Sequence, residues 1–331
     1  MATIREVARH AGVAPITVSR VVNKSGYVSK DIRERVERSI AALDYIPNAL
    51  GPSLRSKKTH IFALILSDIT NPFWTTVARG VEDACNAHGY YVVLCNTDES
   101  QTKQDQYVSV MLRKQVDGFL LVPAQDTNET IRAIQKQDIP IVVLDRTVSD
   151  VEVDIVRCDS EEGAYQLTRH LLQQGHRDIA VVSGPKEIST ARDRVAGYRR
   201  AMEESGLPVD ERNIHWGTFG HNAGYDATKE ILTTTPRPTA LLAGNNFIAI
   251  GAMHALTEAE VRVPQDMALV SFDEFPPGLT IEPFFTSVVQ PAYQMGYRAT
   301  ELLLSRVQGQ TSEPFQEIIL PVEIVLRRSS E

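Results

Sequence analysis

The sequence has few cysteines and no long apolar segment. Its 331 residues include only three cysteines, Cys85, Cys95 and Cys158, which are scattered and lack the Cys-x-x-Cys spacing. This pattern predicts reduced, buried thiols and excludes both a disulfide framework and a cysteine zinc site. No run of about 18 apolar residues occurs, so no membrane-spanning helix is expected. No apolar segment with a cleavage site follows the basic N-terminus, and we therefore expect a cytoplasmic protein.

Motifs of common enzyme classes are also missing. The sequence contains no Gly-rich phosphate loop of the P-loop or dinucleotide type and no Gly-x-Ser-x-Gly nucleophile motif. His170 and His176 are six residues apart, whereas zinc ligands on one helix face are about four apart, so structural roles are favoured for both. We therefore expect no enzyme activity, no cofactor and no metal.

Acidic and basic residues are distributed unequally along the chain. The formal net charge is −8. Residues 1–58 contain eleven Lys and Arg against five Asp and Glu, a net charge of +6, and the remaining residues carry −14. A basic segment on an otherwise acidic protein suits contact with nucleic acid through that segment alone.

Residues 12–23 predict the turn and second helix of a helix-turn-helix motif. Gly12 allows a tight corner, and Pro15 suits the first helical position because its missing N–H costs nothing there. Val18, Val21 and Val22 recur at helical spacing and should face inward. The opposite face carries Pro15, Ile16, Thr17, Ser19, Arg20 and Asn23. These side chains can read base edges in a major groove, although an ordinary amphipathic surface helix fits the same pattern.

Helices are predicted on both sides of this segment. Thr3 and Glu6 have the spacing of a capping box, so a first helix begins after Thr3. Ser29 is a favourable N-cap for a third helix. The apolar face of that helix is formed by Ile32, Val36, Ile40 and Leu43. Three short helices that share an apolar face make a small DNA-binding domain.

The three predicted helices carry a set of residues at fixed spacing. The set consists of Thr3-Ile4, Val7-Ala8, Gly12-Val13, Pro15, Thr17-Val18-Ser19-Arg20-Val21, Asn23, Val28-Ser29, Arg33, Val36, Leu43, Tyr45 and Pro47-Asn48. This set resembles the N-terminus of the LacI/GalR family of bacterial repressors, in register over residues 3–55. The resemblance implies a homodimer that binds roughly palindromic operator DNA, and it adds Thr3 to the expected DNA contacts.

Residues 47–59 are expected to link this head to the rest of the chain. In the family that the sequence resembles, the segment forms a short hinge helix on operator DNA and wedges a leucine into the minor groove, a role that falls to Leu54. Asn48 and Arg55 are expected to contact phosphates or base edges nearby. Gly51 and Pro52 depart from the family and disfavour a helix, so a flexible tether is the alternative.

Residues 60–331 alternate short apolar strands with amphipathic helices. Strands are predicted at 61–66, 91–94, 118–122, 141–144, 179–183, 213–217, 240–243, 269–272, 316–320 and 323–327. Helices are predicted at 72–88, 101–114, 128–137, 161–174, 190–205, 222–233, 246–258 and 291–307. This order predicts an α/β fold class, in which an all-α helix-turn-helix head is joined by a hinge to two doubly wound parallel-sheet lobes.

The resemblance extends to this body, which is similar to periplasmic sugar-binding proteins, and it implies three crossings of the chain between the lobes. The expected domains are a head at 1–46, a hinge at 47–59, a first lobe at 60–160 with 291–320, and a second lobe at 161–290 with 321–331.

Ligands of open parallel sheets bind beyond the carboxyl ends of the strands. The polar and aromatic residues expected there are Asp68, Phe73, Trp74, Asp145, Arg146, Thr190, Arg194, Phe219, Asn245, Asp273 and Gln290. Carboxylates, amides, arginines and aromatic rings together suit the hydroxyls and ring carbons of a sugar. The resemblance places ligand contacts on Arg194, Asn245, Asp273 and Gln290 and ring stacking on Phe73 and Phe219.

We therefore expect a sequence-specific DNA-binding transcriptional repressor that is controlled by a sugar or sugar acid bound between two lobes. Arg146 and Arg194 together would suit an anionic sugar, but either could instead pair with Asp145 or Asp273. The alternative function is a cytoplasmic carbohydrate-binding protein without regulatory DNA binding.

Overall fold

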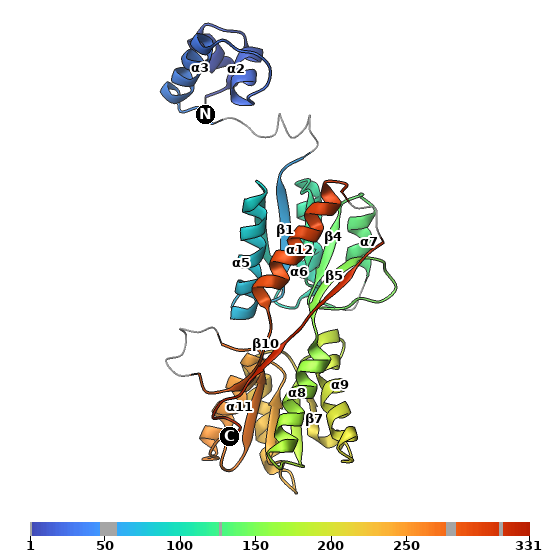
Figure 1. Ribbon diagram of the computed structural model, residues 1–331. Coiled ribbons are helices and arrows are strands. Elements are labelled where there is room, and N and C mark those ends of the chain that lie inside the picture. Colours follow the sequence, from blue (N-terminus) through green and yellow to red (C-terminus); the bar gives the residue numbers. More distant parts are fainter. Residues whose placement is uncertain (1, 47–57, 126–127, 276–282, 311–313) are drawn as a thin grey trace. The chain divides into compact units, whose positions relative to one another are not determined.

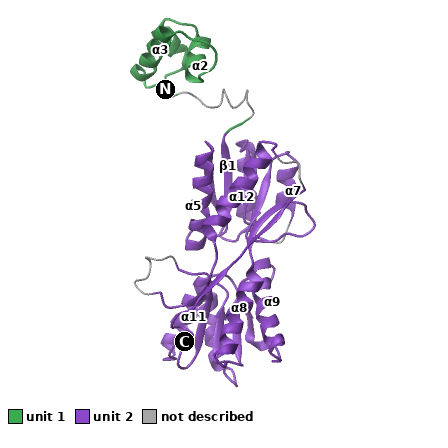
Figure 2. Cartoon of the chain, viewed as in Figure 1, with its two compact units in different colours: residues 1–59 green, residues 60–331 purple. Residues whose placement is uncertain are grey.

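The chain folds as two units that are described separately. The structure is a computed structural model, and it describes residues 2–46, 58–125, 128–275, 283–310 and 314–331. The first unit is Met1–Thr59 and the second is His60–Glu331 (Figure 2).

Unit 1 contains three helices, as the sequence predicts. They are α1 (Ile4–Ala11), α2 (Pro15–Val22) and α3 (Lys30–Ala42). Their shared core consists of Val7, Ala8, Ala11, Val18, Val21 and Val36, all of which are buried. Burying one apolar stripe from each helix is what holds such a small unit together, because helices this short are marginal on their own.

The ends of these helices follow the sequence with one exception. Thr3 and Glu6 form the complete capping box at the start of α1, and Gly12 ends that helix with φ 63°, a left-handed conformation that favours glycine. Pro15 occupies the first turn of α2. Ser29 is the N-cap residue of α3, as predicted, and the exception is that its side chain makes no capping hydrogen bond.

Unit 2 contains two six-stranded sheets (Figure 1). The order in sheet A is β11 (Glu317–Leu320), β5 (Asp154–Cys158), β4 (Ile141–Leu144), β3 (Gly118–Leu121), β1 (Ile61–Leu66) and β2 (Tyr91–Asn96). The order in sheet B is β12 (Glu323–Val325), β10 (Thr286–Val289), β9 (Ala268–Phe272), β8 (Ala240–Ala243), β6 (Ile179–Ser183) and β7 (Ile214–Trp216). The strand pairs are parallel except β10 with β12, which is antiparallel.

Helices cover both faces of each sheet, which defines the doubly wound architecture. Sheet A is covered by α5 (Pro72–Ala87), α6 (Gln101–Arg113), α7 (Glu129–Gln135) and α12 (Ala292–Val307). Sheet B is covered by α8 (Ser160–Gln173), α9 (Ser189–Glu204), α10 (His221–Thr233) and α11 (Asn246–Glu258). The chain passes from sheet A to sheet B after β5, returns after β10, and passes again after β11.

The helices of unit 2 begin and end within two residues of the predicted positions. The strand β5 was not predicted, because Asp154 and Arg157 interrupt its apolar pattern. Asp154 is fully buried in the structure, where Arg306 donates two hydrogen bonds of 2.8 Å to its carboxylate. A long-range ion pair of this kind makes a polar residue acceptable in a central strand, and local sequence gives no sign of it.

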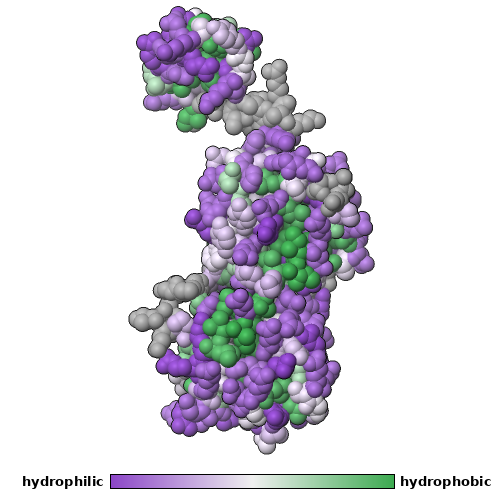
Figure 3. Space-filling model, in the orientation of Figure 1, coloured by the Kyte–Doolittle hydropathy of each residue, from purple (hydrophilic) through white to green (hydrophobic). Residues whose placement is uncertain are grey.

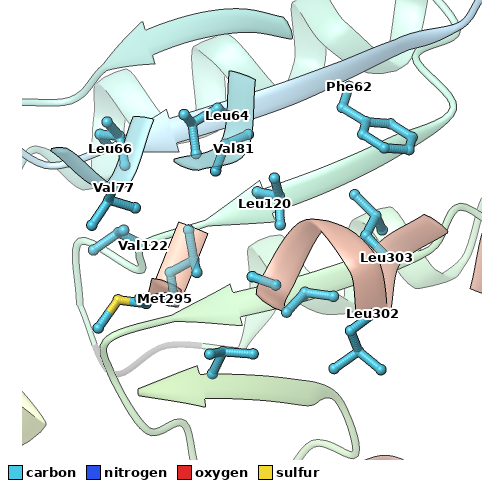
Figure 4. Packing of buried hydrophobic residues seen from close by; sticks show 14 of the residues in the cluster. Phe62, Leu64, Leu66, Val77, Val81, Leu120, Val122, Met295, Leu302 and Leu303 are labelled. Atoms are coloured by element: carbon cyan, nitrogen blue, oxygen red, sulfur yellow. The ribbon is translucent and has the colours of Figure 1, made fainter. Parts of the chain in front are cut away.

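The core of sheet A illustrates how the layers pack. Phe62, Leu64 and Leu66 of β1 face Val77 and Val81 of α5, and α12 adds residues such as Met295 and Leu303 (Figure 4). The visible face of unit 2 is mostly hydrophilic, with apolar side chains gathered in several patches (Figure 3). Among the described residues no helix has the length and apolar character needed to span a bilayer. The three cysteines are free and buried, as predicted, and burial raises the pKa of Cys85 to about 12.

Helices α5 and α12 approach each other through a reciprocal pair of glycines. A Cβ atom on Gly80 would lie 2.1 Å from the carbonyl oxygen of Tyr293, and one on Gly296 would lie 2.1 Å from that of Val77. Both distances are far below van der Waals contact, so the helix pair can pack this closely only with glycine at both positions.

Gly296→Ala is expected to lower the free energy of unfolding by about 1–3 kcal/mol, because the helices must move apart to accept one methyl group. Denaturant unfolding of the full chain measures the change. The control is Arg298→Ala at an exposed position of the same helix, where a change within about 0.5 kcal/mol is expected. Equal stability of the wild type and Gly296→Ala would contradict the close approach.

Candidate functional site

Unit 1 presents one face of α2 to solvent. Pro15, Ile16, Arg20 and Asn23 are exposed, and the side chain of Ile16 retains 56% of its accessible surface. Thr17 and Ser19 are partly buried beside them, and Asn23 donates a 3.1 Å hydrogen bond to the Ser19 hydroxyl. The structure thus places the six predicted residues of this helix together on or beside one open face.

Two further residues of unit 1 bear on this surface. Thr3 is exposed, but its hydroxyl donates a 2.9 Å hydrogen bond to Glu6 and so also serves the capping box. Tyr27 is 90% exposed in the loop between α2 and α3. Tyr27 was not among the residues selected from the sequence. Asn48, Leu54 and Arg55 lie outside the described residues.

A cavity of about 430 Å³ opens between the two sheets of unit 2, at the carboxyl ends of their strands. The volume suits a small ligand. Ten of the eleven predicted effector residues line it: Asp68, Phe73, Trp74, Asp145, Arg146, Thr190, Arg194, Phe219, Asn245 and Asp273. Gln290 is buried and donates a hydrogen bond to the Asp273 carboxylate, so it supports the site from behind.

Arg146 pairs with a residue that the sequence analysis missed. Its Nη1 and Nη2 donate hydrogen bonds of 2.7 and 2.6 Å to the two carboxylate oxygens of Glu99, and Nη1 also donates to the carbonyl oxygen of Pro123. Glu99 follows β2 and also lines the cavity. The predicted alternative of a pair with Asp145 or Asp273 is therefore wrong for Arg146.

Arg194 is held on the opposite side by sheet B. Its Nη1 donates a 2.5 Å hydrogen bond to the carbonyl oxygen of Gly244, and its guanidinium carbon lies 3.8 Å from the ring centroid of Phe272. This cation–π contact and the neighbouring carboxylates stabilise a charge that is almost fully buried.

The two lobes are joined across the cavity by a pair of amides. Asn71, the N-cap of α5, and Asn246, in the first turn of α11, donate 3.0 Å hydrogen bonds to each other's carbonyl oxygen. Each oxygen also accepts a backbone N–H, from Phe73 and Phe247 respectively, which fixes both amide orientations. Thr147 adds a second bridge, since its N–H donates a 2.9 Å hydrogen bond to the Ser189 hydroxyl. Asn246 was not among the predicted site residues.

The two central carboxyl groups are perturbed by burial. Burial raises the pKa of Asp145 to about 6, although the positive charges of Arg194 and Arg146 lower it. Burial also raises the pKa of Asp273, against Arg194 and the hydrogen bond from Gln290. Both residues have left-handed backbones, with φ of 65° and 68°. Two strained, buried carboxylates from different sheets that share one cavity are typical of a functional site.

Several buried polar atoms of the cavity lack hydrogen-bond partners. Within the part of the chain that the structure describes, these atoms are Ser67 Oγ, Asp145 Oδ1, Arg146 Nε and Arg194 Nε, and Gln290 Oε1 behind the cavity also lacks a partner. Buried polar groups are normally satisfied, so a cluster of unsatisfied donors and acceptors indicates a place for a polar ligand. Phe73, Trp74 and Phe219 supply apolar faces beside them.

His170 and His176, for which structural roles were predicted, each lie within hydrogen-bond distance of a hydroxyl group. His170 lies 2.9 Å from the Ser330 hydroxyl, and His176 lies 2.9 Å from the Thr239 hydroxyl. Among the described residues no cluster of three or more His, Cys, Asp or Glu is arranged to hold a metal ion.

A three-helix head with an open recognition face and a two-lobed body with a polar ligand cavity define a ligand-responsive DNA-binding regulator. Two family models match the chain. The model of bacterial regulatory proteins of the LacI family matches residues 3–48, and the model of periplasmic binding proteins and the sugar-binding domain of the LacI family matches residues 59–326. The chain belongs to the LacI family and is a DNA-binding transcriptional regulator.

Individual relatives are similar over the full length. The ribose operon repressor of Escherichia coli (strain K12) is 35% identical over 332 residues, which cover 100% of both chains. A crystal structure of the lac repressor dimer bound to operator is 27% identical, has a TM-score of 0.86 and covers 99% of both chains. The complex of the transcriptional regulator CelR with cellobiose is 31% identical, has a TM-score of 0.76 and covers 99% of this chain and 100% of that one.

Asp145→Asn is expected to stabilise the ligand-free protein above pH 6. The ordinary carboxyl pKa is 3.8 and the folded value is about 6, so ionisation opposes folding at higher pH by about 3 kcal/mol. Asn has the same shape and tolerates the left-handed backbone.

This advantage of Asp145→Asn over the wild type should shrink as the pH falls from 7.5 through 6 to 4.5, because the wild-type carboxyl then binds a proton in the folded state. Urea unfolding of the wild type and of Asp145→Asn at these pH values measures the difference in their free energies of unfolding. A difference in stability that does not change with pH would show that Asp145 is not buried as an ion.

Proposed function

We propose that this regulator is a repressor, and that a small sugar bound between the two lobes of unit 2 controls its affinity for operator DNA. One observation carries the proposal: residues selected from the ends of strands in both sheets converge on a single cavity with unsatisfied donors and acceptors. The ribose operon repressor and the cellobiose complex among its relatives support a carbohydrate as the effector.

The cavity residues are assigned roles by their chemistry. Asp145 and Asp273 accept hydrogen bonds from ligand hydroxyls, while Asn245, Thr190 and Arg194 donate to ligand oxygens. Phe73, Trp74 and Phe219 contact the apolar faces of the sugar ring, and Asp68 and Gln290 complete the polar surroundings. These roles describe binding without catalysis, in keeping with relatives that are transcriptional regulators.

The DNA-binding roles belong to the head. Pro15, Ile16, Thr17, Ser19 and Arg20 enter the major groove, and Thr3, Asn23, Asn48 and Arg55 contact the backbone or base edges around it. Leu54 enters the minor groove from the hinge. The proposed domains are 1–46, the hinge 47–59, the first lobe 60–160 with 291–320, and the second lobe 161–290 with 321–331, in a cytoplasmic protein.

A second copy of the chain completes the operator-binding unit. The edge strand β2 exposes Tyr91, Val93 and Leu94, with Tyr91 72% exposed, and Ile250 of α11 and Tyr293 of α12 are exposed as well. Apolar residues on an exposed sheet edge mark a surface that another chain covers. The operator-bound lac repressor dimer among its relatives supports this assembly, and a two-fold dimer presents two recognition helices to a palindrome.

A gel-shift assay with DNA from the region upstream of the protein's own gene tests the proposal. We expect a shift at low salt that specific unlabelled DNA competes away, and a changed shift with one sugar of a panel. The alternative, a carbohydrate-binding protein without regulatory DNA binding, predicts sugar binding with no shift on any such fragment.

Arg20→Ala is expected to cost about 1–3 kcal/mol of operator affinity and to relax base preference at one position of each half-site, because a bidentate contact to a base edge is lost. Binding of a library with single base changes in the operator measures both effects. If all sequences are weakened equally, Arg20 is a phosphate contact and the assigned role is wrong.

Asp273→Asn is expected to weaken sugar binding by at least about tenfold while operator binding is retained, since a buried ionic acceptor is replaced by a neutral amide. The substitution keeps the side-chain shape and suits the left-handed backbone. Calorimetry and DNA binding are measured on the same preparation. The matched control is Asp266→Asn, whose carboxylate accepts hydrogen bonds from Arg262 on the surface. A parallel loss of DNA binding in Asp273→Asn would indicate misfolding instead.

A further inference from the structure

The charge of the cavity favours one class of sugar over another. Its lining includes five carboxylates, Asp68, Asp98, Glu99, Asp145 and Asp273, and two guanidinium groups, Arg146 and Arg194. Asp98 is paired with Lys103 at the surface. A negative ligand would therefore enter a cavity in which negative groups outnumber positive ones, and it could bind only if an arginine were available to it.

Arg146 is the arginine that an anionic ligand would need, and Glu99 occupies it. The bidentate pair with Glu99 and the bond to the Pro123 carbonyl account for three of its five N–H donors. The side chain of Arg146 is 4% exposed and that of Glu99 is 30% exposed. The positive charge of Arg146 is thus neutralised by the carboxylate of Glu99, a second residue that lines the cavity.

The backbone around Glu99 is shaped to hold this pair. Asp98 and Glu99 both have positive φ, 50° and 57°, and two successive non-glycine residues in this conformation are strained. The Asp98 carboxylate accepts hydrogen bonds from Asn96 and Lys103, which brace the turn. The surrounding contacts hold this strained turn, and the turn places the Glu99 carboxylate against Arg146.

Arg194 is also engaged, through one of its N–H donors and through its charge. Its guanidinium bonds to Gly244 and lies on the Phe272 ring, and Asp145 and Asp273 both interact with its charge. The unsatisfied atoms of the lining residues Asp145, Arg146 and Arg194 are the acceptor Asp145 Oδ1 and the donors Arg146 Nε and Arg194 Nε, so the ligand groups must both donate and accept hydrogen bonds. Hydroxyl groups do both, whereas a carboxylate only accepts and would leave Asp145 Oδ1 unpaired.

We propose that the cavity selects a neutral sugar and rejects the corresponding sugar acid, and that Glu99 determines this selectivity by sequestering Arg146. The inference rests on the proposed function, because it specifies the chemical class of the effector in the same cavity. It resolves the choice between a sugar and a sugar acid in favour of the uncharged ligand.

The test compares each neutral sugar with its own aldonate on the full-length wild-type protein. The pairs are D-ribose with D-ribonate, D-xylose with D-xylonate, and D-glucose with D-gluconate, screened by thermal shift and quantified by calorimetry at pH 7.5. We expect one neutral sugar to bind at least about tenfold more tightly than its acid. A wild-type protein that binds an aldonate as tightly as its sugar overturns the proposal.

Glu99→Gln tests the assigned residue. It removes the charge and keeps the size, so Arg146 becomes available and the preference for the neutral sugar should fall at least about tenfold. Asp266→Asn, which removes a carboxylate from a bidentate arginine pair outside the cavity, should keep the wild-type preference. Glu99→Ala serves as a second variant should Glu99→Gln fail to fold.

Two other outcomes count against the idea. Variants that bind the neutral sugar with an unchanged preference over the acid would show that Glu99 does not determine selectivity. A wild-type protein that binds its operator but takes neither member of any pair would overturn the carbohydrate effector in the proposed function, and this inference would fall with it.

Discussion

The structure of unit 2 depends on one constraint: polar groups at the carboxyl ends of parallel strands must be satisfied by something other than the sheet. Two sheets direct these ends toward one cavity, and their carboxylates, amides and arginines meet there. Reciprocal hydrogen bonds between Asn71 and Asn246 satisfy some of the groups by joining the lobes. Other buried atoms have no hydrogen-bond partner among the described residues, and a ligand that satisfied them from both lobes would favour the closed arrangement.

The proposed function gives a way for a small ligand to influence the DNA-binding surface of unit 1. A sugar that contacted Asp145 of one lobe and Asp273 of the other would bind better with the lobes closed around it. The ligand shifts the protein between states only by its difference in affinity for them, typically about 1–3 kcal/mol. In a dimer joined through its lobes, such a shift changes the spacing of the two heads, and a palindromic operator is sensitive to that spacing.

The features that sequence predicted are those encoded by local patterns. Helices and strands could be predicted from the capping residue Thr3, the turn at Gly12 and the apolar pattern of strands such as β1 and β6. The rule that ligands bind beyond the carboxyl ends of strands selected ten of the residues that line the cavity. What escaped prediction depends on contacts between distant residues. Asp154 is acceptable in β5 because Arg306 reaches it, and Glu99 joins the site because Arg146, 47 positions away, binds it. Neither partner can be read from neighbouring residues.

The proposed regulation requires that sugar binding in unit 2 and DNA binding by unit 1 are linked. Fluorescence anisotropy of an operator fragment, titrated with the full-length protein at fixed salt with and without a saturating sugar, measures that linkage directly. We expect the sugar that binds in the cavity to change operator affinity by roughly 5- to 150-fold. An operator affinity that stays the same while calorimetry shows sugar binding would show that the two binding events are not linked.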